Sequence, residues 1–68
     1  MTVSSQVKQT LAGLKSAQAS LEQFALQTQN NQAKQVYTNA AAQTQTIVDT
    51  LEQRVLQLEQ EEPQYKGF

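Results

Sequence analysis

The 68-residue sequence contains no cysteine and no histidine. Disulfide bonds are therefore excluded, and the thiolate and imidazole ligands of the usual zinc, haem and iron–sulfur sites are missing. A chain this short buries so little apolar area that the gain roughly balances the cost of ordering its residues. Small proteins compensate with disulfides, a metal or oligomerisation. We therefore expect this chain to associate with itself or with a partner.

Charge is also scarce, since only 16% of the residues are Asp, Glu, Lys or Arg. The basic residues stand singly, at Lys8, Lys15, Lys34, Arg54 and Lys66. A nucleic-acid-binding protein normally carries a clustered basic face, and a helix lying on a membrane carries basic residues beside a strongly apolar face. The composition therefore argues against nucleic acid and against direct membrane insertion.

Long apolar runs are absent, so we expect no transmembrane segment. The polar start at residues 2–6 (TVSSQ) does not resemble a signal peptide. The sequence predicts a protein that is not secreted and stays in the cytoplasm, where it is made.

Catalytic patterns are missing as well. Asp49 and Glu52 are three residues apart, as are Glu59 and Glu62, and this spacing can place two acids on one helix face. Di-iron bundles, however, also need Glu-x-x-His motifs and acids from every helix, and the first half of the chain has only Glu22. There is no Ser/His or Cys/His pair and no glycine-rich phosphate loop. We expect a protein that is not an enzyme and binds no cofactor or metal.

What the sequence does contain is an apolar stripe that occurs twice, with steps of three or four residues. In the first half it comprises Val3, Val7, Leu11, Leu14, Ala17, Leu21, Phe24 and Thr28. In the second half it comprises Ala33, Tyr37, Ala40, Thr44, Ile47, Leu51, Val55 and Leu58. Such steps keep side chains on one face of an α-helix. The fold class is therefore all-α, an antiparallel two-helix hairpin.

The boundaries follow from local chemistry. Thr2 or Ser4 can cap the first helix, and Pro63 ends the second because the residue before a proline leaves the helical region. Asn at 30–31 tolerates the left-handed conformation that ends helices and also caps the next one. The sequence thus predicts a hairpin over residues 1–62, with helix one at about 3–29, a turn at 30–31 and helix two at about 32–62, followed by a tail at 63–68. One continuous helix through the turn is the alternative.

Folding at the turn brings together residues whose numbers sum to roughly 61, as in antiparallel bundles. This register places Phe24 beside Tyr37 and lets Lys8 reach Glu52. A hairpin has one internal seam, so we expect two copies to pack into a four-helix bundle, as a homodimer or tetramer. The predicted core and oligomer interface comprises Val7, Leu11, Leu14, Leu21, Phe24, Tyr37, Ala40, Ile47, Val48, Leu51, Val55 and Leu58.

Two features allow further interpretations. The tail carries Pro63, Tyr65 and Phe68, and aromatic anchors of this kind are favoured in docking peptides. The same aromatics can instead fold back over the open end of the bundle. Thr44 could line a cavity for a small ligand or metal beside Ala40, although a helical Thr more often bonds its own backbone carbonyls.

Three segments carry a resemblance to a known family: residues 2–11 (TVSSQVKQTL), 21–25 (LEQFA) and, most specifically, 61–68 (EEPQYKGF). With them the chain resembles a family of small proteins from endospore-forming bacteria that is known as a domain of unknown function. Members are often encoded beside spore membrane proteins of the germination-channel group. The resemblance implies a sporulation context, in the cytoplasm or spore interior, but no activity and no catalytic residues.

The leading hypothesis is therefore a non-enzymatic interaction or structural protein that self-associates and docks a spore membrane protein through its tail. The alternative is a small spore DNA-coating protein, because such proteins are also short, rich in Gln and Asn, and helical on DNA. This chain lacks their glycine-bearing motifs, and its few dispersed cations would neutralise few phosphates.

Overall fold

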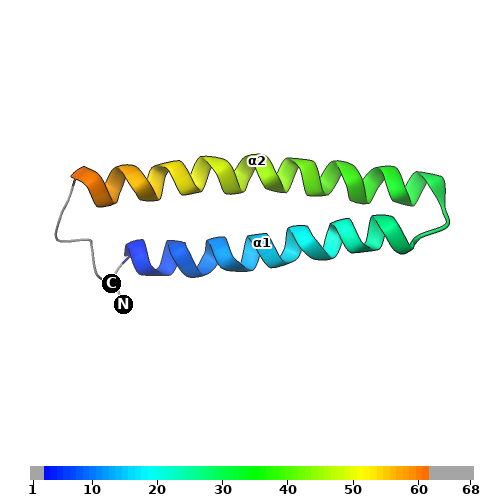
Figure 1. Cartoon of the computed structure of the whole chain (residues 1–68), viewed down its shortest axis with the longest axis horizontal. Coiled ribbons are helices and arrows are strands. Elements are labelled where there is room, and N and C mark those ends of the chain that lie inside the picture. The colour runs from blue at the N-terminus through cyan, green and yellow to red at the C-terminus, as the bar shows by residue number, and fades with distance from the viewer. Residues whose placement is uncertain (1–2, 62–68) are drawn as a thin grey trace.

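The computed structural model describes residues 3–61 and shows two antiparallel α-helices lying side by side (Figure 1). Helix α1 spans Val3–Gln27 and helix α2 spans Asn31–Glu61. No strand is present in this part of the chain. The predicted all-α hairpin is confirmed, and the alternative of one continuous helix is wrong. The tail at 63–68 and the proposed cap Thr2 lie outside the described residues.

The connection between the helices is held by side-chain caps. The Thr28 backbone N–H still donates to the Phe24 carbonyl at 2.9 Å, and the Thr28 hydroxyl then accepts from the Asn30 N–H at 3.2 Å. The Asn30 side-chain oxygen accepts from the Ala33 N–H at 2.8 Å, while its carbonyl accepts from the Lys34 N–H at 2.9 Å. Asn30 is therefore the N-cap of α2. Because Thr28 redirects the chain, α1 ends slightly earlier than the predicted residue 29.

Ser4, the other candidate cap, does not cap α1. The helix already begins at Val3, and the Ser4 side chain is buried at 4% exposure. Its hydroxyl has no hydrogen-bond partner among the described residues.

The core of the hairpin is one seam along the two helices. Its centre is formed by Leu11, Val48 and Val55, with three half-buried side chains packed against them: Val7, Leu14 and Leu51. Ala25 and Ala41 are buried closer to the turn. The seam positions alternate steps of three and four residues, as in a heptad repeat. In α1 and directly after it they are Ser4, Val7, Leu11, Leu14, Gln18, Leu21, Ala25 and Thr28, and in α2 they are Tyr37, Ala41, Thr44, Val48, Leu51, Val55 and Leu58. A few residues beside the seam are half-buried as well: Ser5, Ala33, Ala40, Glu52 and Glu59.

This seam corrects part of the predicted stripe. Phe24 and Ile47 were expected in the core, but they are 47% and 50% exposed. Ala25 and Val48, one residue further along, take the buried positions. The stripe followed the more apolar residue at each step, whereas the packing follows a strict seven-residue repeat. Phe24 nevertheless meets Tyr37 edge to face, with ring centroids 5.9 Å apart, as the register predicted.

The ion pairs between the helices also differ from the prediction. Lys8 pairs with Glu59 rather than with Glu52, and Glu52 pairs with Lys15 at 2.6 Å. Helical side chains lean toward the N-terminus of their own helix. In an antiparallel pair, two long side chains therefore meet although their Cα atoms are offset along the hairpin. Their residue numbers sum to 67, against 61 for Phe24 and Tyr37.

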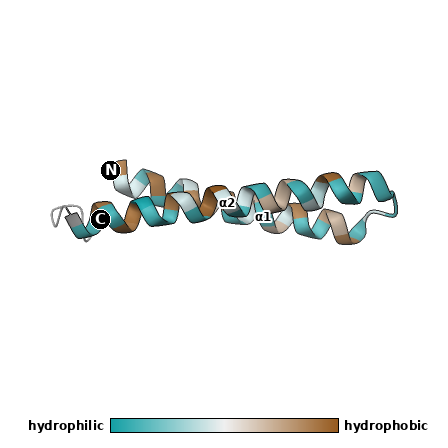
Figure 2. Cartoon of the chain, turned by 90° about the horizontal axis from the view of Figure 1, so that it is seen from above, coloured by the Kyte–Doolittle hydropathy of each residue, from teal (hydrophilic) through white to brown (hydrophobic). Residues whose placement is uncertain are grey.

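The hairpin is a single layer, 12 Å across its shortest axis, which is about one helix diameter. Only the seam is covered, so several large apolar side chains remain exposed: Val3, Leu26, Val36 and Leu56. Figure 2 shows hydrophobic and hydrophilic residues alternating along both helices. Neither described helix combines the length and apolar character needed to cross a membrane.

Candidate functional site

The seam leaves one lateral face on each side of the hairpin, and the two faces differ in charge. The charged face is defined by the positions flanking the seam on the side of the ion pairs: Lys8, Lys15, Glu22, Thr38, Gln45, Glu52 and Glu59. The uncharged face is defined by the positions flanking the opposite side: Val3, Thr10, Ala17, Phe24, Ala33, Ala40, Ile47 and Arg54. Members of each set repeat at seven-residue intervals within a helix and so share one side of it.

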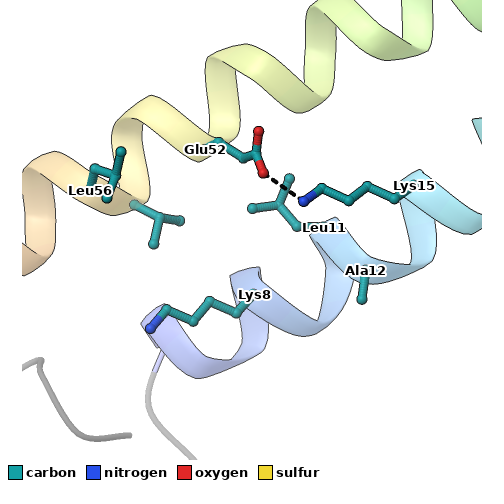
Figure 3. A pocket seen from close by; sticks show the side chains of 7 residues that line it. Lys8, Leu11, Ala12, Lys15, Glu52 and Leu56 are labelled. Carbon is teal, nitrogen blue, oxygen red and sulfur yellow. Dashed lines mark ion pairs between the residues drawn. The ribbon is translucent and has the colours of Figure 1, made fainter.

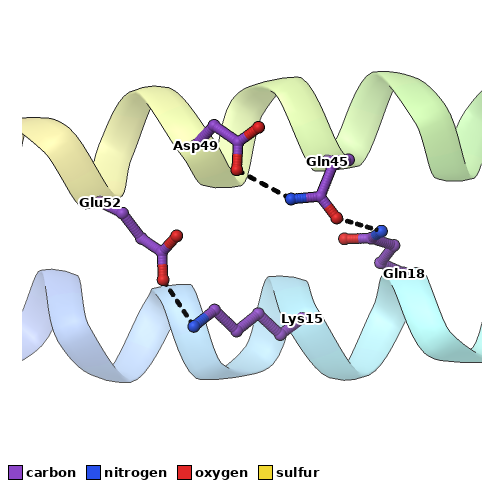
Figure 4. Close-up of polar contacts among 5 residues, drawn as sticks. All are labelled: Lys15, Gln18, Gln45, Asp49 and Glu52. Carbon is purple, nitrogen blue, oxygen red and sulfur yellow. Dashed lines mark hydrogen bonds and ion pairs between the residues drawn. The ribbon is translucent and has the colours of Figure 1, made fainter.

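Polar contacts connect the two helices across the charged face. Lys15 and Glu52 form an ion pair, and the Gln18 side-chain N–H donates to the Gln45 side-chain oxygen at 2.6 Å (Figure 4). Gln45 in turn donates to Asp49 at 2.8 Å. These groups are exposed or half-buried, and exposed ion pairs contribute about 0–1 kcal/mol each. The contacts therefore occupy the polar groups of this face and add little to stability.

Two shallow hollows lie along the charged face. The first has a volume of about 500 Å³, with Leu11 and Val55 in its lining and Lys8, Lys15 and Glu52 around them (Figure 3). The second, also about 500 Å³, lies nearer the turn between Glu22 and Lys34. Neither contains a nucleophile with an adjacent base. No group of three potential metal ligands occurs within residues 3–61.

The uncharged face combines exposed apolar residues with small ones. Phe24 and Ile47 are about half exposed there, and the small residues Ala17 and Ala40 lie between them along the hairpin. Arg54 carries the only charged side chain that the structure describes on this face.

The next outward positions on this side are uncharged too: Gln6, Gly13, Ser20, Gln27, Val36, Gln43, Thr50 and Gln57. A Cβ atom built on Gly13 would meet nothing within 4 Å, so the packing of the hairpin does not require glycine there. The result is a long surface with apolar centres and almost no charge.

The predicted core and interface residues divide into three groups. Leu11, Val48 and Val55 are buried within the hairpin, and the partly exposed group comprises Val7, Leu14, Leu21, Tyr37, Ala40, Leu51 and Leu58. Phe24 and Ile47 lie on the uncharged face, outside the seam. Their participation in an interface between chains stays a prediction. The tail residues Pro63, Tyr65 and Phe68 lie outside the described residues.

The predicted core does not include the buried alanines, Ala25 and Ala41, which lie beside the predicted stripe, and the separation of charge between the two faces was not predicted. Writing both helices as strict heptads anchored on Leu11 and Val48 would have found all three features. The Thr44 hydroxyl donates to its own helix, to the Ala40 carbonyl at 2.8 Å, and Thr44 lines neither hollow of the charged face. This arrangement favours the local hydrogen bond over a ligand site.

Comparison with known proteins identifies a family but no activity. No curated protein and no solved structure matches the chain. The profile of one family, described as "Protein of unknown function (DUF1657)", matches residues 7–55. This range contains the buried core and the Lys15–Glu52 pair but not the distinctive ending at 61–68. Because the match covers more than half of the chain, the protein belongs to this DUF1657 family of proteins of unknown function.

Proposed function

We propose that the protein is a non-enzymatic interaction protein whose hairpins self-associate into a four-helix bundle, as a homodimer or tetramer. The observation that carries this proposal is the uncharged face, where Phe24 and Ile47 stay half exposed beside small residues. Amphipathic helices normally bury such side chains against another element. A single-layer hairpin offers no further element within residues 3–61.

The surface area of the chain supports the same proposal. The chain exposes 5047 Å², whereas a compact monomer of its 7.6 kDa mass exposes about 4,300 Å². The excess of roughly 750 Å² is close to the ~800 Å² that each partner buries in a standard interface. One partner surface of ordinary size would therefore bring the chain to a normal degree of burial.

Light scattering on a gel-filtration peak of the full-length protein tests self-association. We expect a mass of two or four times 7.6 kDa that falls toward the chain mass on dilution. Circular dichroism on the same fractions shows whether the helices persist. A folded, helical monomer at every concentration would overturn the proposal.

We further propose a role in sporulating cells, with the tail docking a spore membrane protein. Support comes from the resemblance carried by residues 61–68 and from the aromatic character of the tail. The test is a pull-down from sporulating cells with the full chain and with a Tyr65→Ser/Phe68→Ser variant. We expect the membrane protein to be captured by the full chain alone. Equal capture by both proteins would refute docking through the tail.

The DNA-coating alternative gains no support from the charge distribution. Lys8 and Lys15, the two basic residues near the open end of α1, are each paired with a glutamate of α2. Lys34 lies near the turn and Arg54 on the opposite face, so these described cations do not form one basic surface. DNA binding relies on several cations along one path to neutralise successive phosphates.

A further inference from the structure

We infer that the uncharged face is the surface on which a second copy docks, with the two hairpins antiparallel, so that the turn of one lies beside the open end of the other. This inference rests on the proposed self-association and adds which face is used and in which direction. It follows from the placement of charge, the placement of bulky and small side chains, and the position of Arg54.

Charge decides between the two faces. On the charged face, docking would cover two ion pairs and the Gln18–Gln45–Asp49 contacts, and removing charged groups from water is costly. On the uncharged face, Arg54 is the only charged side chain described. The cost of removing the face from water is therefore far lower on the uncharged side, where the apolar Phe24 and Ile47 also gain from burial.

A second copy fits this face because its contour is self-complementary. The midpoints of the two helices fall at residue 15 in α1 and residue 46 in α2. With a two-fold axis across these midpoints, Ile47 lies beside the axis and meets its own copy. On α1, Gly13 and Ala17 lie equally far from the midpoint, so each faces the other across the interface. Small residues at that point let the two α1 backbones approach closely, while Ile47 fills the space between the α2 helices.

A charged partner would be selected by charges on this face, and Arg54 is the only charged side chain that the structure describes there. The excess exposed area also matches one standard partner surface. Both observations favour a copy of the same chain as the occupant.

The position of Arg54 favours the antiparallel over the parallel arrangement of the two hairpins. If the two hairpins ran parallel, both Arg54 side chains would lie at the same height in the interface, and like charges would approach. In the antiparallel arrangement the axis brings Arg54 to the level of residue 38 in the partner copy, beside the edge-to-face pair of Phe24 and Tyr37. A guanidinium is attracted to an aromatic face within about 6 Å. Among the described residues, Arg54 donates one hydrogen bond, to the Gln57 side-chain oxygen at 3.4 Å, and this bond is long and easily exchanged.

The choice of face is tested by two matched substitutions in the full-length chain, Ala17→Glu and Ala19→Glu. Both alanines are exposed on α1 and lie two residues apart, but only Ala17 belongs to the uncharged face. We expect Ala17→Glu to raise the dissociation constant of self-association at least tenfold, measured by sedimentation, and Ala19→Glu to change it less than threefold. Circular dichroism should show equal helicity for both, since neither side chain packs in the seam.

Each outcome has a distinct meaning. A wild-type chain that does not associate refutes the proposed function itself. A wild-type chain that associates while Ala17→Glu has no greater effect than Ala19→Glu overturns the choice of face. A larger effect of Ala19→Glu assigns the interface to the opposite side.

The direction is tested with a spin label, because the chain has no native cysteine to interfere. Gln27→Cys places the label at the exposed end of α1, next to the turn. In the antiparallel dimer the two labels are separated along the hairpin by about 36 Å, from the helical rise of 1.5 Å per residue. A parallel dimer brings them within about 20 Å of each other, two helix diameters. A distance in that shorter range would overturn the antiparallel arrangement.

Discussion

The placement of the seam predicts opposite behaviour for two adjacent apolar residues, Ile47 and Val48. Val48 is the most completely buried large side chain among the described residues, at 1% exposure, whereas Ile47 is 50% exposed. Val48→Ala removes two methyl groups, worth about 0.8 kcal/mol each, and leaves a cavity in the core that Val48 forms with Leu11 and Val55. We therefore expect a loss of about 2–3 kcal/mol in the free energy of unfolding, at any protein concentration.

Ile47→Ala removes more carbon atoms but from a half-exposed position. At high dilution, where the hairpin is not associated, we expect it to lower the free energy of unfolding by less than about 1 kcal/mol. At high concentration the loss should grow, because Ile47 then lies in the proposed interface.

Urea titration followed by circular dichroism, at two protein concentrations about a hundredfold apart, measures both effects. If Val48→Ala is unfolded in buffer, the comparison is made in an osmolyte such as trimethylamine oxide, which strengthens burial for all variants alike. Equal losses for the two variants at high dilution, or a larger loss for Ile47→Ala, would refute the seam described above.

Further predictions concern the turn, the glycine and nucleic acid. Asn30→Ala should lower the free energy of unfolding by about 1 kcal/mol because the α2 cap is lost, while Asn31→Ala, one residue inside the helix, should leave it nearly unchanged. Thermal melts compare the two variants, and equal melting temperatures would contradict the cap. Gly13→Ala should stabilise the dissociated hairpin by about 1 kcal/mol, because the added methyl group meets nothing and alanine favours the helix. Urea titration at low protein concentration measures this, and a destabilised hairpin would show that the site is packed. A gel-shift assay at low salt should show no retardation of duplex DNA by micromolar protein, and a salt-dependent shift would favour the DNA-coating alternative instead.

Most of the fold was predictable because its determinants are local and periodic. Two stripes with helical steps, separated by residues 29–32, predict two helices and favour one reversal between them. The capping chemistry of asparagine also indicated where the second helix begins, and Asn30 does cap it.

The phase of the seam was harder to predict because adjacent residues compete for it. Ile47 and Val48 are both apolar, and hydrophobicity alone cannot decide which of them faces the other helix. At Phe24 and Ala25 the larger residue was the natural choice, yet a strict seven-residue repeat from Leu11 leads to Ala25. The packed helices follow the repeat because the next residue along a helix is rotated by about 100° about the helix axis and so points away from the seam.

The ion pairs were missed for a different reason. A register written for Cα atoms ignores that long helical side chains point toward the N-terminus of their own helix. For this reason Lys8 pairs with Glu59 and not with Glu52. The same omission hid the charged face, because its partners look distant in a residue-by-residue pairing. The chemistry of a partner is not written in any local pattern, so the sequence could propose self-association but not the surface that carries it.

We propose that this hairpin completes its core with a second copy of itself. Sedimentation equilibrium of the full-length protein over a hundredfold range of concentration tests this claim most directly. We expect a reversible increase in mass from 7.6 kDa to two or four times that value. A single mass of 7.6 kDa throughout the range, with full helicity at the lowest concentration, would contradict it.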